Sequence, residues 1–152
     1  MFLLGFGVFL LAVVLTIRIQ GGMVLDFIDP ASLLFILLPL VAVLVATKSF
    51  QVFYGGLRAV IFPNRPITEE LRGQAATLFR FLSKTMAVVI FAGVLIGFVN
   101  LLMVNWNGID ASGVARIGIN IVFMLTASLH GLFWIAAVFE PVVFILKKRR
   151  GQ

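Results

Sequence analysis

The most informative part of the sequence is residues 84–146, which read KTMAVVIFAGVLIGFVNLLMVNWNGIDASGVARIGINIVFMLTASLHGLFWIAAVFEPVVFIL. Two long apolar segments, 84–104 and 117–146, flank a short polar connection at 105–113. An apolar helix of about 20 residues is long enough to cross the hydrocarbon core of a bilayer. The stretch therefore predicts a transmembrane helical hairpin.

Composition supports the same class for the whole chain. Of the 152 residues, 62% are hydrophobic and 12% are charged, which is too apolar for an ordinary soluble surface. The absence of cysteine excludes disulfides and thiolate chemistry, and a single histidine argues against a metal centre. We expect an all-α integral membrane protein that is not an enzyme and has no cofactor. The net charge of +6 is assigned to the flanks of membrane segments and not to a nucleic-acid surface.

Two further apolar segments precede the hairpin, so the chain predicts a single membrane domain, 1–152, with spans at about 2–19, 31–50, 84–104 and 117–146. Gly21-Gly22 marks a turn, and Asp29-Pro30 with Ser32 marks the start of the second helix. From Lys48 the pattern indicates an amphipathic continuation of that helix, which breaks at residues 63–66. The segment 48–84 is thus expected to be a short cytoplasmic helical region.

Orientation follows from the basic residues. Ten of the twelve lysines and arginines lie in the central segment, at its helix ends or at the C-terminus, and only Arg18 and Arg116 lie in the other two turns. Cytoplasmic loops carry an excess of Lys and Arg. We therefore expect both termini and the segment 48–84 on the cytoplasmic side.

The polar and small residues of the hairpin are few. They are Gly93, Gly97 and Asn100 in the first helix, and Thr126, Ser128, His130 and Gly131 in the second. Small residues let helix backbones approach closely, and polar groups in hydrocarbon need a protein partner or a water path. Two interpretations stay open, close packing between helices or an ion path. His130 could be a hydrogen-bonded interface residue or a proton relay, because imidazole titrates near neutral pH.

Three motifs resemble the flagellar stator A-subunit (MotA) family, within the MotA/TolQ/ExbB proton-channel superfamily. After Gly21-Gly22, residues 27–34 read FIDPASLL and resemble the start of the second helix in that family. Residues 92–99, AGVLIGFV, are similar to its third-helix pattern. Residues 126–131, TASLHG, followed by Pro141, are similar to its fourth-helix pattern. The likeness covers all four expected spans.

The resemblance implies the A-type subunit of an ion-driven 5:2 motor in the bacterial inner membrane. Five copies, a homopentamer, would ring two single-span B-type (MotB/ExbD-like) subunits that carry a membrane aspartate, and proton flow would drive rotation. Carried over by position, the face for the ion path or the partner helix comprises Gly93, Val94, Gly97, Asn100, Thr126, Ala127, Ser128, His130 and Gly131.

Two further sites concern the cytoplasmic side. Glu140 and Pro141 are candidates for an ion exit, although Glu140 could instead pair with a basic residue at the membrane boundary. The central segment is much shorter than the cytoplasmic loop of flagellar stator subunits. Contact with a rotor or another target would fall on Arg58, Arg65, Glu69, Glu70 and Arg72, which otherwise form a solvated face.

The choice of ion rests on two positions. Sodium-driven relatives place threonines where this chain has Val94 and Ala127, so we expect protons in preference to sodium. None of the six acidic residues is expected at the centre of the membrane, since Asp26, Asp29 and Asp110 are assigned to the outer turns. The partner is therefore expected to supply the carboxylate that binds the ion at that depth.

Two alternatives remain. One is an energiser of an envelope process, like the TolQ/ExbB subunits, which typically have three spans. The other is a non-conducting membrane scaffold whose glycines and polar residues only join helices. A co-purifying single-span protein with a membrane aspartate would separate the motor and energiser from the scaffold.

Overall fold

The structure is a computed structural model that describes residues 2–19, 29–64, 67–103 and 111–148. These residues form helices and no strand, which confirms the prediction of an all-helical chain. The elements are α1 (Phe2–Ile19), α2 (Pro30–Ala46), α3 (Phe50–Ile61), α4 (Glu69–Leu102), α5 (Ala111–Trp134), the π-helical turn η2 (Ile135–Phe139) and α6 (Glu140–Lys148).

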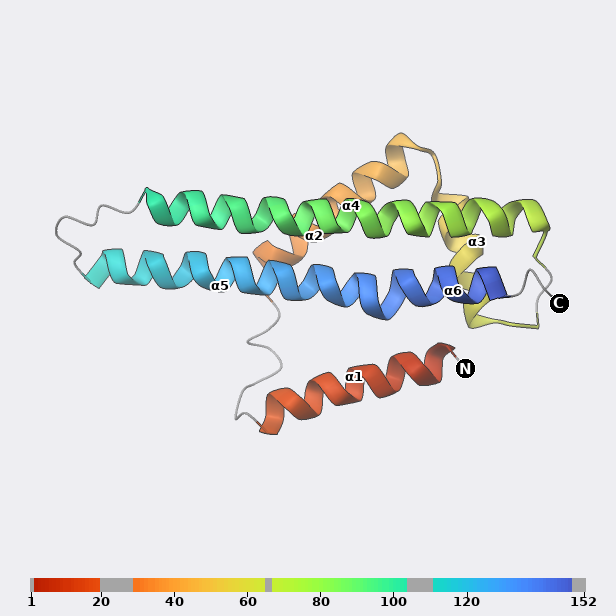
Figure 1. The fold of residues 1–152 in the computed structure, drawn as a ribbon, viewed down its shortest axis with the longest axis horizontal. Coiled ribbons are helices and arrows are strands. Elements are labelled where there is room, and N and C mark those ends of the chain that lie inside the picture. Colours follow the sequence, from red (N-terminus) through yellow and green to blue (C-terminus); the bar gives the residue numbers. More distant parts are fainter. Residues whose placement is uncertain (1, 20–28, 65–66, 104–110, 149–152) are drawn as a thin grey trace.

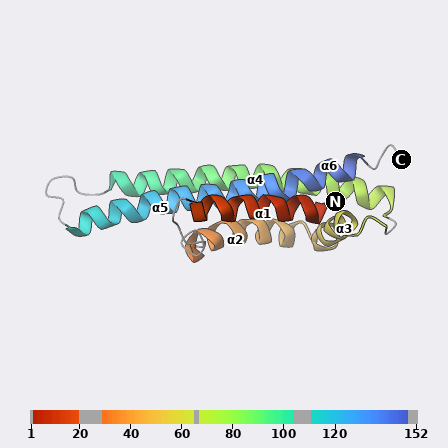
Figure 2. The same cartoon turned by 90° about the horizontal axis from the view of Figure 1, so that it is seen from below.

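The molecule is built around two long antiparallel rods. One is α4, with 34 residues, and the other is the continuous run of α5, η2 and α6, which lies beside it (Figure 1). Helix α2 lies across one face of this pair, and α1 runs beside α5 and α6 (Figure 2). Helix α1 ends and α2 begins short of the hairpin connection, so the last part of α4 and the first part of α5 extend beyond them (Figure 1).

The core gathers where α3, α4 and α6 meet. Its largest fully buried side chains include Phe79, Leu82, Phe139 and Leu146. Phe79 stacks on Phe53 of α3 and packs at a tilt against Phe139 of η2. Aromatic pairs of this kind add specific contacts to the burial of apolar area. The end of the molecule that carries α3 is therefore its best-packed part.

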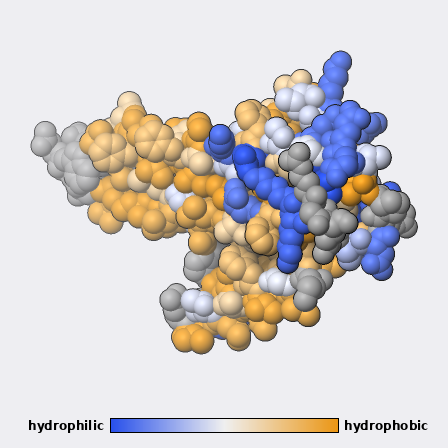
Figure 3. All heavy atoms as spheres, turned by 45° about the vertical axis from the view of Figure 1, so that its right-hand side comes forward, coloured by the Kyte–Doolittle hydropathy of each residue, from blue (hydrophilic) through white to orange (hydrophobic). Residues whose placement is uncertain are grey.

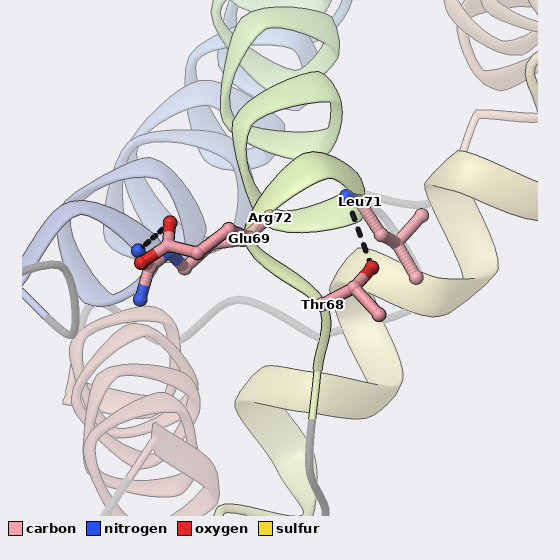
Figure 4. Close-up of polar contacts among 4 residues, drawn as sticks. All are labelled: Thr68, Glu69, Leu71 and Arg72. Carbon is pink, nitrogen blue, oxygen red and sulfur yellow. Dashed lines mark hydrogen bonds and ion pairs between the residues drawn. The ribbon is translucent and has the colours of Figure 1, made fainter.

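Local signals explain where two helices begin. Pro30 is the first residue of α2, and the carboxylate of Asp29 caps this helix by accepting a hydrogen bond from the Ser32 amide at 2.8 Å. Thr68 caps α4, because its hydroxyl accepts from the Leu71 amide at 3.3 Å (Figure 4). Such side chains satisfy amides that have no partner within the first helical turn.

The prediction that the second helix continues past Lys48 is wrong. Helices α2 and α3 are separated by residues 47–49 and are bent by 112° relative to each other. Lys48 has a φ of 51°, its amide donates to the carbonyl of Val45, and the Ser49 amide donates to the carbonyl of Leu44. This is the Schellman pattern that ends helices. The amphipathic spacing continued through the turn, so periodicity alone did not reveal it.

The surface is that of a membrane-embedded protein. Helix α1, helix α4 and the run 116–148 are each long and apolar enough to cross a bilayer, and the bent pair α2–α3 could supply a fourth crossing. Large apolar side chains lie exposed on several helices, for example Leu4 at 74% and Val88 at 69%. Hydrophilic residues gather at one end of the molecule in the view of Figure 3.

Candidate functional site

The hairpin glycines pack against side chains of the same chain. A Cβ atom at Gly97 would overlap Cγ of Met124, and one at Gly93 would lie 2.9 Å from Cε1 of Phe35 in α2. A Cβ at Gly131 would lie 2.6 Å from Cδ1 of Ile90. These three faces are thus filled by α2, α4 and α5 themselves. Within the single chain, Gly93, Gly97 and Gly131 thus serve packing between its own helices.

The same packing brings together several of the predicted site residues. Ala127 is fully buried, and its Cβ lies 3.6 Å from the position that a Cβ of Gly93 would take. Val94, on the next position of α4, is half-buried, and Asn100 is exposed. Ser128 donates to the carbonyl of Met124 at 2.7 Å within its own helix.

A polar chain joins α2 to α5. The hydroxyl of Ser32 donates to Oδ2 of Asp29 at 2.5 Å and lies 2.8 Å from Oγ1 of Thr126. Thr126 can in turn donate to the carbonyl of Val122 at 2.8 Å. Ser32 and Thr126 are buried, with exposed fractions of 0% and 8%. Buried hydroxyls need such partners, because an unpaired polar group costs about 1–3 kcal/mol.

His130 lies one helical turn after Thr126. Its Nδ1 is buried and accepts or donates no hydrogen bond within the described residues. The imidazole lines a cavity of about 510 Å³ between α1 and α5 whose other lining residues are mostly apolar. The only histidine of the chain thus stands beside the polar chain with one ring nitrogen unsatisfied.

A π-helical turn separates this region from the predicted ion exit. Pro141 has no N–H to donate, and its ring would clash with the carbonyl four residues earlier in a regular α-helix. The turn Ile135–Phe139 ends just before Pro141, and the Glu140 amide reaches back to the carbonyl of Ile135. Glu140 is exposed, and Pro141 is half-buried in a groove of about 430 Å³ against α1.

The cytoplasmic candidates differ in their environment. Arg72 is buried and forms an ion pair with Glu69 one turn earlier, so its guanidinium is not displayed to a target (Figure 4). Glu70 is exposed and accepts from the amide of Gln74 at 3.2 Å, and Arg58 is exposed. Arg65 lies outside the described residues.

Two residues of the polar chain were missed as functional candidates. The sequence assigned Asp29 to an outer turn and Ser32 to a helix start, but Ser32 contacts Thr126 of α5 and also bonds Asp29. The available signal was an acid placed directly before an apolar span, together with one hydroxyl in each of two apolar helices. Nothing local in the sequence shows at which level of the hairpin α2 begins.

These features define an all-helical, membrane-embedded protein with a polar contact between its second helix and its hairpin. Within the described residues, no three His, Cys, Asp or Glu side chains lie close enough together to hold a metal ion. Comparison of the chain with protein-family models, with curated proteins and with solved structures finds no match.

Proposed function

We propose that this protein is the A-type subunit of an ion-driven 5:2 channel in the bacterial inner membrane, which couples proton flow to mechanical work through a single-span partner. The proposal rests on the sequence resemblance to flagellar stator A subunits. The structural observation that supports it best is the length of α4. A helix of 34 residues exceeds the about 20 needed to cross a bilayer, so α4 continues from the membrane into the polar end.

The proposal places contacts with other subunits on exposed apolar faces. On α4, Val88, Phe91 and Leu95 recur at helical spacing and have exposed fractions of 69%, 63% and 45%. Since the glycine faces are filled within the chain, this strip is the surface that a neighbouring subunit or the partner helix would cover. Contiguous exposed apolar surface marks contact with lipid or with another protein.

A scaffold is the second candidate. It is favoured by one specific observation, namely that Gly93, Gly97 and Gly131 all serve packing between helices of the same chain. Small residues in membrane helices commonly have this role alone. An energiser of the TolQ/ExbB kind shares the proposed mechanism and differs in the process that it drives.

The experiment is to purify the protein in mild detergent from its native membrane and to count chains by native mass spectrometry. The proposal predicts five copies with two copies of a single-span protein that carries a membrane acid. Liposomes holding this complex should pass protons, independently of sodium, and lose the flux when the partner's acid is replaced. A homomer without a second protein would support the scaffold, and conductance by the chain alone would remove the need for a partner.

A further inference from the structure

The contacts of α2 show at which point along α4 and α5 this helix begins. Ser32 contacts Thr126, and Phe35 contacts Gly93, so the first turn of α2 lies beside these two positions. Leu102, the last residue of α4, follows Gly93 by nine residues, which is about 14 Å of helix. Arg116 precedes Thr126 by ten residues, or about 15 Å. Each distance is about half of the 30 Å hydrocarbon core.

Between this level and the connection from α4 to α5, the outer surface of the hairpin is apolar. Leu102 and Ile119 have exposed fractions of 63% and 67%, and Leu95, Phe98 and Val122 are also exposed there. Such a surface belongs in hydrocarbon and not in water. The membrane therefore extends to the outer ends of α4 and α5, and Asp29 lies near its middle. The backbone of Asp29 is extended, with φ −87° and ψ 115°, and non-helical backbone at this depth occurs only against protein or a water-filled cavity.

The polar chain can hold a proton on Asp29 in exchange for the hydrogen bond that Oδ2 accepts from the Ser32 amide. Three oxygen contacts run from the Asp29 carboxyl through Ser32 and Thr126 to the carbonyl of Val122. Each contact needs one hydrogen, and the two hydroxyls supply two. A protonated Asp29 supplies the third, so Asp29 donates to Ser32, Ser32 to Thr126, and Thr126 to Val122. When Asp29 is ionised, Ser32 donates to the carboxylate instead. The two states differ by rotation of the hydroxyls and by the hydrogen bond from the Ser32 amide to Oδ2, which the ionised carboxylate accepts.

We propose that Asp29 is a proton-binding group of this chain at mid-depth in the membrane, with the hydroxyls of Ser32 and Thr126 as the relay that completes its hydrogen bonds when it is protonated. The site goes beyond the proposed function, because it needs neither a ring nor a partner. It differs from the expectation that every acid of the chain lies away from the membrane centre. A binding site is not a channel, so the chain alone need not conduct.

The charged and titratable groups that face this site are few. Within the described residues, α5 contributes His130, which lies one helical turn after Thr126. Helix α1 ends with Arg18 in its last turn. Helix α4 has no titratable residue between Lys84 and Leu102, and α2 has none after Asp29.

The test uses dicyclohexylcarbodiimide, an apolar reagent that adds a protonated carboxyl group across one of its C=N bonds. The purified chain in lipid vesicles is treated over a range of pH, and adducts are located by mass spectrometry. We expect Asp29 to be the labelled residue, with labelling that falls as pH rises. Asp29→Asn keeps a capping side chain and should abolish the adduct, whereas the matched control Glu140→Gln should leave it unchanged.

Two variants of the relay separate proton binding from a structural role. Thr126→Val removes the acceptor for Ser32 in the protonated state only, so the midpoint of labelling should move to lower pH by about half to one unit. Thr126→Ser keeps a hydroxyl and should restore the original midpoint. Absence of an adduct on Asp29 at every pH, or a midpoint that Thr126→Val leaves in place, would overturn the proposal. Neither result depends on the 5:2 assembly, which chain counting tests separately.

Discussion

At the scale of single residues, the hairpin is held by matched pairs of a glycine and a large side chain. Met124 fills the space that a side chain at Gly97 would need, and Ile90 does the same at Gly131. The four-residue spacing of Gly93 and Gly97 in an apolar helix predicted either close packing between helices or an ion path. Which helix makes the contact was not predictable, because the spacing is the same for a neighbour in the chain and for a partner.

The pair Gly97 and Met124 gives the first prediction. Gly97→Ala should lower the free energy of unfolding by about 1–3 kcal/mol, because the added methyl group overlaps Met124. The control Gly118→Ala, where nothing lies within 4 Å, should be neutral or stabilise by up to about 1 kcal/mol. Thermal unfolding in detergent measures both.

Met124→Ala provides the second half of this test. The double variant Gly97→Ala/Met124→Ala should lose less stability than the sum of the two single variants, because the clash is gone. Strict additivity would show that Gly97 and Met124 do not touch.

At the scale of elements, the turn between α2 and α3 changes the direction of the chain. Helix α2 ends in a Schellman pattern in which Lys48 takes the left-handed position that glycine usually occupies. The start of α2 at Asp29-Pro30 and the break after α3 at residues 63–66 were predictable from capping residues and prolines. The 112° bend was not, because lysine gives no signal for a positive φ.

Lys48 gives the second prediction. Lys48→Gly should raise the free energy of unfolding by about 1 kcal/mol, because glycine adopts a φ of 51° without a clash at Cβ. Lys48→Ala removes the same charge but keeps the Cβ, so it should bring no such gain. Thermal unfolding in detergent measures both variants. Equal stabilisation by both would assign the effect to the lost charge and not to the backbone.

At the scale of the whole molecule, the polar end and the apolar remainder set the orientation. Most basic residues lie on the segment 48–84 or at the C-terminus, and hydrophilic residues gather at one end of the structure (Figure 3). The apolar spans and the class of protein were predictable from composition and run length. The depth of α2 was not, because it depends on a contact between Ser32 and Thr126, 94 residues apart.

Orientation is tested by the third prediction. The chain has no cysteine, so single cysteines can be introduced without a background. A cysteine at Gln74, which is exposed on α4, should react only with reagent on the cytoplasmic side. A cysteine at Asn107, in the connection of the hairpin, should react only from the opposite side. Labelling of both from one side would show that the hairpin does not cross the membrane.

The position of α2 within the membrane is tested most directly by measuring depth. Nitroxide labels on single cysteines at Ala31, Lys84, Leu95 and Leu102 can be ranked by their collisions with oxygen and with a water-soluble nickel complex. Lys84 and Leu102 should report the two surfaces, and Ala31 should match Leu95 near the bilayer centre. A label at Ala31 that reports the outer surface, with Leu102 in water beyond it, would contradict a mid-membrane Asp29.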